Sequence, residues 1–141
     1  MLSNNISALA IALLAGACAA APSDDRLGGL WSLRISNADH REVSVATIRF
    51  TDDPARSCMG GDWKGVVVES VTATDERFFP LSDPLSYSAG RSEITIGRNE
   101  ICDGYLHLRG KLESGTVRGV YVSFGIEGGE TLGDFTLIRM P

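Results

Sequence analysis

Residues 105–124 read YLHLRGKLESGTVRGVYVSF, and this stretch decides the fold class of the 141-residue chain. Leu106, Leu108 and Leu112 alternate with polar side chains, Glu113-Ser114-Gly115 follows, and then a second alternating run begins. Alternation is typical of a strand with one buried face, and two such runs around a short polar turn form a hairpin. The stretch therefore predicts an antiparallel β-hairpin.

The same period of two recurs from residue 30 onward, with breaks at about every 8–15 residues. The expected strands lie near residues 31–35, 46–50, 66–74, 94–96, 105–112, 120–124 and 135–139. The segment 78–87 contains Pro80 and Pro84, and proline cannot donate to a sheet ladder. We expect an edge, a bulge or two short pieces there.

Chain length indicates one domain. About eight strands joined by short turns predict an all-β fold, a single small antiparallel up-and-down β-barrel over residues 30–141, because closure removes unpaired edges. An eight-stranded barrel is either filled by side chains or holds one small ligand. A two-sheet sandwich has the same sequence pattern and is the alternative.

Residues 6–21 read ISALAIALLAGACAAA, and no charged side chain occurs before Asp24. This apolar stretch is shorter than the roughly 20 residues that a membrane span needs. It has the character of a secretory signal, with small residues where a peptidase would cut. The N-terminal segment therefore predicts export.

Leu14-Ala15-Gly16-Ala17-Cys18 resembles the lipobox of bacterial lipoproteins, in which the cysteine is lipidated and begins the mature chain. The resemblance implies a signal peptide over residues 1–17, a lipid on Cys18 and a polar tether over residues 18–29. It also implies a location in the cell envelope, on the outer membrane and facing the periplasm. An ordinary signal cut between Ala17 and Ala21, or an uncleaved anchor, are the alternatives.

If Cys18 carries the lipid, Cys58 and Cys102 form an even pair in an oxidising compartment. A disulfide between them would stabilise the fold by about 3–4 kcal/mol in the loop-entropy account. Neither cysteine has a CxxC neighbour, and two histidines are too few for a zinc set. The pair predicts a structural bridge rather than redox or metal chemistry.

Gly29-Leu30-Trp31 opens the first strand, and Arg139 ends the last one. This pattern resembles the calycins, which include lipocalins, fatty-acid-binding proteins, avidins and bacterial metalloprotease inhibitors. The resemblance implies that Trp31 plugs the closed end of the barrel and that Arg139 packs over its ring. A guanidinium over an indole face contributes about 0.5–2 kcal/mol.

The two expected pairings make opposite demands on the number of strands. Trp31 and Arg139 share an end only if the total is even. Short loops carrying Cys58 and Cys102 share an end only if an even number of strands separates them. Since two strands are expected before Cys58 and three after Cys102, an even number between them makes the total number of strands odd. The segment between Phe50 and Cys58 can span about 20 Å along the barrel wall, which would reconcile both pairings with eight strands.

No catalytic motif is present in the chain. His40 and His107 occupy polar positions where we expect solvated side chains, and nothing singles out a catalytic pair among the 18 carboxylates. No nucleophile elbow, P-loop or zinc-protease motif occurs, so no enzyme activity, metal or cofactor is expected. The net charge of -5 argues against nucleic acid as a partner.

One local string is distinctive, the loop of Met59, Gly60, Gly61, Asp62 and Trp63. Met and Trp side chains are common at binding hot spots, so this loop is a candidate recognition surface. In the alternative reading, Trp63 caps the barrel and the two glycines only form the turn.

These features predict a non-catalytic envelope lipoprotein that binds a small apolar ligand or an envelope protein. The alternative is an inhibitor of a secreted protease or of a lysozyme-like hydrolase. Residues 22–29 would then enter the protease cleft, and Ser88-Ala89-Gly90-Arg91 is a loose echo of a lysozyme-inhibitor motif. A ligand binder should have an apolar interior cavity of about 300 Å³ or more, whereas an inhibitor should have a filled interior and a rigid exposed loop.

Overall fold

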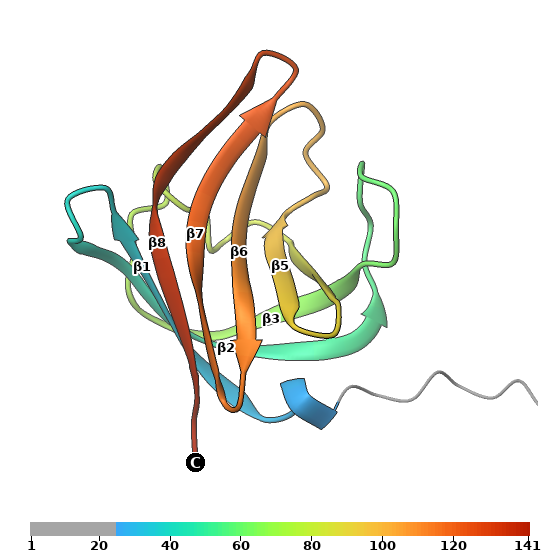
Figure 1. Ribbon diagram of the computed structural model, residues 1–141, viewed down its shortest axis with the longest axis vertical. Coiled ribbons are helices and arrows are strands. Elements are labelled where there is room, and N and C mark those ends of the chain that lie inside the picture. The colour runs from blue at the N-terminus through green and yellow to red at the C-terminus, as the bar shows by residue number, and fades with distance from the viewer. Residues whose placement is uncertain (1–24) are drawn as a thin grey trace, which may run out of the picture.

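Eight antiparallel strands, paired in chain order, close into a barrel in the computed structural model, which describes residues 25–141 (Figure 1). The all-β barrel prediction is confirmed, and the sandwich alternative is wrong. A short 3-10 helix, η1 (Asp25–Leu27), precedes the barrel. The strands are β1 (Leu30–Asn37), β2 (Glu42–Pro54), β3 (Lys64–Ala73), β4 (Leu85–Ala89), β5 (Glu93–Arg98), β6 (Tyr105–Glu113), β7 (Thr116–Gly125) and β8 (Gly128–Arg139).

The N-terminal predictions fall outside this part of the chain. The signal peptide over residues 1–17, the lipid on Cys18 and most of the tether precede residue 25. Within residues 25–141, no helix has the length and apolar character to cross a membrane.

The barrel closes where the first strand meets the last. β1 pairs with β8 in a register that places Trp31 opposite Arg139 and Leu33 opposite Leu137. Inward and outward side chains alternate along β1, so that Trp31, Leu33 and Ile35 are fully buried. The period of two in the sequence thus becomes one apolar lining shared by all the strands.

Side chains fill the interior of the barrel. Trp31 packs edge-on against Phe50 near one end, with ring centroids 6.0 Å apart, and Phe79 packs edge-on against Tyr121 near the other, at 5.3 Å. An eight-stranded barrel is either filled by its side chains or hollow enough for one small ligand, and this barrel is filled. The buried cluster contains Leu27, Trp31, Leu33, Ile35, Ala46, Ile48, Phe50, Phe79, Leu81, Leu85, Tyr87, Ile94, Ile96, Leu108, Val117, Tyr121, Phe135 and Leu137.

The proline-containing segment 78–87 splits into two parts. Only its last residues belong to a strand, because β4 begins at Leu85. Residues 74–84, between β3 and β4, form a cover over one end of the barrel, where Phe79 and Leu81 are buried and the Tyr121 hydroxyl donates to the carbonyl of Phe78. We call this the open end, and the end beside Trp31 the closed end. The cover explains the lack of alternation, since its apolar side chains point down into the barrel.

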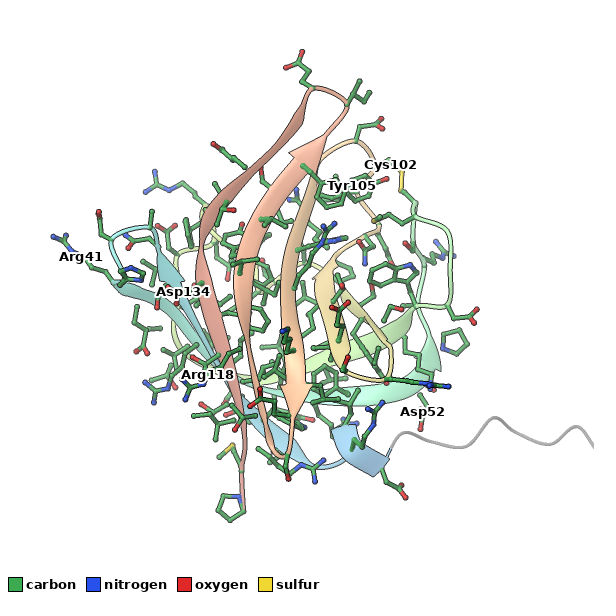
Figure 2. The ribbon with its side chains drawn as sticks, viewed as in Figure 1. Arg41, Asp52, Cys102, Tyr105, Arg118 and Asp134 are labelled. Carbon is green, nitrogen blue, oxygen red and sulfur yellow. A yellow bond between two sulfur atoms is a disulfide. The ribbon has the colours of Figure 1, made fainter. Side chains whose placement is uncertain are left out.

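Cys58 and Cys102 lie at disulfide distance, with Cα atoms 5.5 Å apart. Three strands separate their loops, so by topology the loops begin at opposite ends of the barrel. The loop after β2 resolves this conflict because it climbs along the barrel wall toward Cys102 (Figures 1 and 2). Its backbone is fixed there by a hydrogen bond from the Cys58 amide to the Asn99 carbonyl, 2.8 Å long.

Candidate functional site

The closed end is sealed by the pair that the calycin resemblance implied. The Arg139 guanidinium lies over the Trp31 ring, 5.1 Å from its centroid. The indole Nε1 donates to the Leu27 carbonyl at 3.1 Å, and Arg139 donates to the carbonyls of Asp25 and Arg26. The last strand therefore holds η1 in place beneath the ring.

Residues 25–27, which the sequence assigns to the tether, are part of this seal. Leu27 is buried in the core cluster. The Arg26 guanidinium donates to the carbonyls of Gly90 and Arg91 in the turn between β4 and β5. This turn contains the loose echo of the lysozyme-inhibitor motif, and its carbonyls serve here to hold η1.

The predicted recognition loop covers the outside of the barrel. Trp63 is only 9% exposed, its ring lies 5.7 Å from that of His107, and its Nε1 donates to the Gly60 carbonyl at 3.1 Å. Gly60, Gly61 and Asp62 are exposed, and Met59 is half-buried. Trp63 thus neither projects as an anchor nor caps the barrel end, because it packs over the outer face of β6.

The expectation of a solvated His107 is wrong. The side chain points out of the barrel, as the alternation requires, yet it is only 1% exposed. The loop between β2 and β3 covers it, and the Phe124 ring packs edge-on against it at 4.8 Å. On β5, Gly97 leaves the space that this imidazole fills, since a Cβ there would clash with it. His40, in contrast, is exposed and contacts Asp134 at 2.8 Å.

His107 ends a short chain of buried polar groups. Its Nε2 lies 2.7 Å from the Asn99 Oδ1, and the Asn99 Nδ2 donates to the Ser86 hydroxyl at 2.7 Å. Its Nδ1 is buried without a hydrogen-bond partner among the described residues. Burial, with the nearby charge of Arg109, lowers the pKa of His107 to about 4. The imidazole is neutral at pH 7, and the chain of groups is a structural support for the loop.

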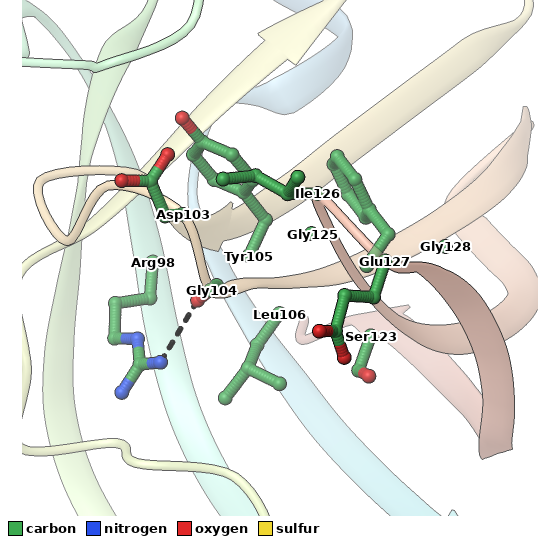
Figure 3. Close-up of a pocket in the computed structure, with 11 residues that line it drawn as sticks. Arg98, Asp103, Gly104, Tyr105, Leu106, Ser123, Gly125, Ile126, Glu127 and Gly128 are labelled. Atoms are coloured by element: carbon green, nitrogen blue, oxygen red, sulfur yellow. Dashed lines mark hydrogen bonds between the residues drawn. The ribbon is translucent and has the colours of Figure 1, made fainter.

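The open end carries a concave pocket of about 550 Å³ between the β5–β6 loop and the β7–β8 hairpin (Figure 3). Tyr105 and Phe124 stack at 5.1 Å, and Ile126 at the hairpin tip is 88% exposed. Positive φ angles at Asp103 (68°) and Gly128 (118°) shape the two loops. No pattern in the sequence marks this pocket, because its residues come from separate strands and form no local motif.

Arg98 joins the pocket to the cover of the barrel. Its guanidinium donates to the Asp83 carboxylate at 3.3 Å. It also donates to the Gly104 carbonyl at 3.0 Å (Figure 3). The first bond reaches the 74–84 cover and the second reaches the β5–β6 loop. One side chain thus fixes the floor of the pocket to the packed interior.

Among residues 25–141, no three His, Cys, Asp or Glu side chains gather into a group that could hold a metal ion. Comparisons of the chain with protein-family models, with curated proteins and with solved structures find no match. The fold is a small closed eight-stranded antiparallel barrel, consistent with the calycin resemblance.

Proposed function

We propose that this protein is a non-catalytic lipoprotein of the bacterial envelope that binds a protein partner at the open end of its barrel. The observation that carries the proposal is the contrast between a filled interior and a concave, aromatic-lined pocket outside. A ligand held inside would have to displace Phe79 and Tyr121, both fully buried. The open-end pocket can be reached without any such change.

The residues of the pocket have the chemistry of a protein interface. Tyr105 and Phe124 offer stacked rings, and Ile126 offers an exposed apolar side chain beside them. Such side chains dominate binding energy at protein interfaces. The disulfide and Arg98 fix the β5–β6 loop, so little ordering entropy would be lost on binding.

The lipid would hold the protein at the membrane through Cys18. One acyl chain alone anchors weakly, so stable attachment relies on the several chains that bacterial lipoproteins carry. Asp25, the first described residue, lies at the closed end, beneath Trp31. This arrangement leaves the open end clear of the attachment point.

A second candidate is inhibition of a secreted hydrolase, and the shape of the β7–β8 hairpin favours it. The hairpin projects beyond the other strands at the open end (Figure 1). An apolar tip on a paired two-stranded element is a fixed shape that could enter an enzyme cleft. Both candidates use the same end of the barrel, and the identity of the captured partner separates them.

Native mass spectrometry and photo-crosslinking test the proposal. Protein purified from its own envelope should carry a lipid on Cys18 and no small molecule inside the barrel. A photoreactive residue at Ile126 should crosslink one defined partner, whereas the same residue at Val67, exposed on the outer face of β3, should not. A retained apolar ligand, or equal crosslinking from both positions, would contradict the proposal.

A further inference from the structure

The charged side chains of the barrel are unevenly divided between its two ends. The open-end segments 37–42, 74–84, 98–104 and 125–134 carry ten carboxylates and three Arg side chains. The closed-end segments 25–30, 51–54, 63–65, 89–93, 111–118 and 137–141 carry five carboxylates and six Lys or Arg side chains. The negative net charge of the protein is therefore concentrated at the open end.

Two of the closed-end cations face each other on neighbouring strands. Lys111 on β6 is paired in register with Arg118 on β7, and like charges placed opposite each other destabilise a sheet. Glu93 is opposite Lys111 on the other side, yet no ion pair within 4.0 Å joins them. Arg118 likewise makes no ion pair within 4.0 Å with any carboxylate of residues 25–141. Neither cation has a partner that the fold requires.

Exposed apolar side chains lie beside these cations. Leu30 on β1, Ile138 on β8 and Met140 just after β8 are 41%, 47% and 41% exposed. The Met140 amide donates to the Leu30 carbonyl, and Ile138 is paired with Thr116, two residues before Arg118. We call the surface formed by Leu30, Lys111, Arg118, Ile138 and Met140 the closed-end face. Figure 2 shows Arg118 lower in the molecule than Arg41.

We propose that the closed-end face rests on the surface of an anionic phospholipid bilayer and so turns the open end away from the membrane. The inference rests on the proposed function, because attachment through Cys18 would bring the barrel to that surface. Seven positions separate Cys18 from Asp25, a reach of at most about 25 Å. The chain enters the barrel at the closed end, which is therefore the end held near the lipid.

Electrostatics and burial favour the same orientation. Each Lys or Arg close to an anionic bilayer strengthens attachment roughly five-fold, within about one Debye length of the surface. The acidic open end is repelled by the same surface. Leu30, Ile138 and Met140 can enter the headgroup region beside the cations, a combination that is common in peripheral membrane contacts.

Amide hydrogen exchange on the full-length protein, reconstituted in vesicles, tests the orientation. Vesicles of phosphatidylcholine alone are compared with vesicles that also contain phosphatidylglycerol. Amides of residues 113–116 and 138–140 should exchange several-fold more slowly in the anionic vesicles, while those of residues 101–104 and 125–128 should not change. Equal exchange in the two lipids, or slowing at the open end, would overturn the proposal.

Charge reversal supplies a matched pair of variants. Lys111→Glu with Arg118→Glu should abolish the slowing, whereas Arg41→Glu with Arg77→Glu changes the net charge equally at exposed sites of the open end and should preserve it. Both variants should keep the wild-type circular dichroism spectrum.

Failure of anchoring is read separately, from the mass of the Cys18 peptide. If that peptide carries no lipid, the closed-end face is tested by sedimentation of the same protein with the two kinds of vesicle. More protein must then sediment with the phosphatidylglycerol vesicles, and equal sedimentation would overturn the proposal.

Discussion

At the scale of single residues, His107 shows how a polar outward position can become buried. The alternation along β6 correctly predicts that the His107 side chain points out of the barrel, but the loop between β2 and β3 covers this outer face. A buried imidazole with a lowered pKa makes stability depend on pH. The imidazole of the unfolded chain is protonated below its ordinary pKa of about 6.5, whereas that of the folded chain is protonated only below about 4.

The first prediction concerns this pH dependence. Between pH 6.5 and 4 the unfolded state binds more protons at His107, so the free energy of unfolding should fall by roughly 3 kcal/mol as the pH decreases over that range. Urea unfolding at several pH values measures it. In His107→Gln this part of the slope should vanish, which separates it from the carboxylates that titrate in the same range. An unchanged slope in the variant would show that the fold does not lower the pKa of His107.

Arg139 allows a second prediction at the residue scale. Arg139→Met should lower the free energy of unfolding by about 1–3 kcal/mol, because it removes a cation over the Trp31 ring and the hydrogen bonds that hold η1. Arg118→Met is the control, since it removes an exposed cation at the same end and should change stability by less than about 0.5 kcal/mol. Equal effects in thermal unfolding would mean that the seal contributes nothing.

At the scale of elements, the loop between β2 and β3 depends on its disulfide. Replacing Cys58 and Cys102 with Ala should lower the free energy of unfolding by about 2–4 kcal/mol, because the bridge restricts the unfolded chain. The loop should also loosen from β6, so that Trp63 emission shifts to the red. Alkylation of two thiols in the untreated native protein, at positions 58 and 102, would refute the bridge.

The strands themselves were largely predictable, and the loops were not. β1 and β8 each have one buried face and one mostly wet face, and the alternation of Leu, Ile and Phe along them locates them in the sequence; the Leu residues of β6 do the same on its inner face. The 74–84 cover has no such period, because its apolar residues pack end-on into the barrel. The path of the loop after Pro54 depends on contacts with Asn99 and Cys102, which are distant in sequence.

At the scale of the whole molecule, the filled interior leads to a prediction about apolar probes. 8-Anilinonaphthalene-1-sulfonate titrated into the native protein at pH 7 should fluoresce only from the exposed open-end pocket, so that its signal is lost in Phe124→Ser with Ile126→Ser, because Phe79 and Tyr121 occupy the barrel. The Phe79→Ala variant tests whether that side chain keeps the dye out. Saturable binding of one dye per molecule that survives the two serine replacements would favour a ligand-binding role for the interior.

The candidate site was much harder to predict than the barrel. Its pocket joins Arg98, Tyr105 and Phe124 through strand pairing, and no spacing in the sequence reveals that juxtaposition. Whether an eight-stranded barrel is hollow or packed likewise depends on which loops fold inward. Here the decisive residues, Phe79 and Leu81, lie in the segment with the weakest pattern.

The seal at the closed end has a mechanical consequence. β1 begins directly after η1, and it lies between β2 and β8 with hydrogen bonds on both sides. If a partner pulled on the open end while the N-terminus was held, the force would run along β1, across the direction of its ladder bonds. Those bonds would be loaded together in shear rather than opened one by one like a zipper. The barrel is therefore built to withstand tension applied between its two ends.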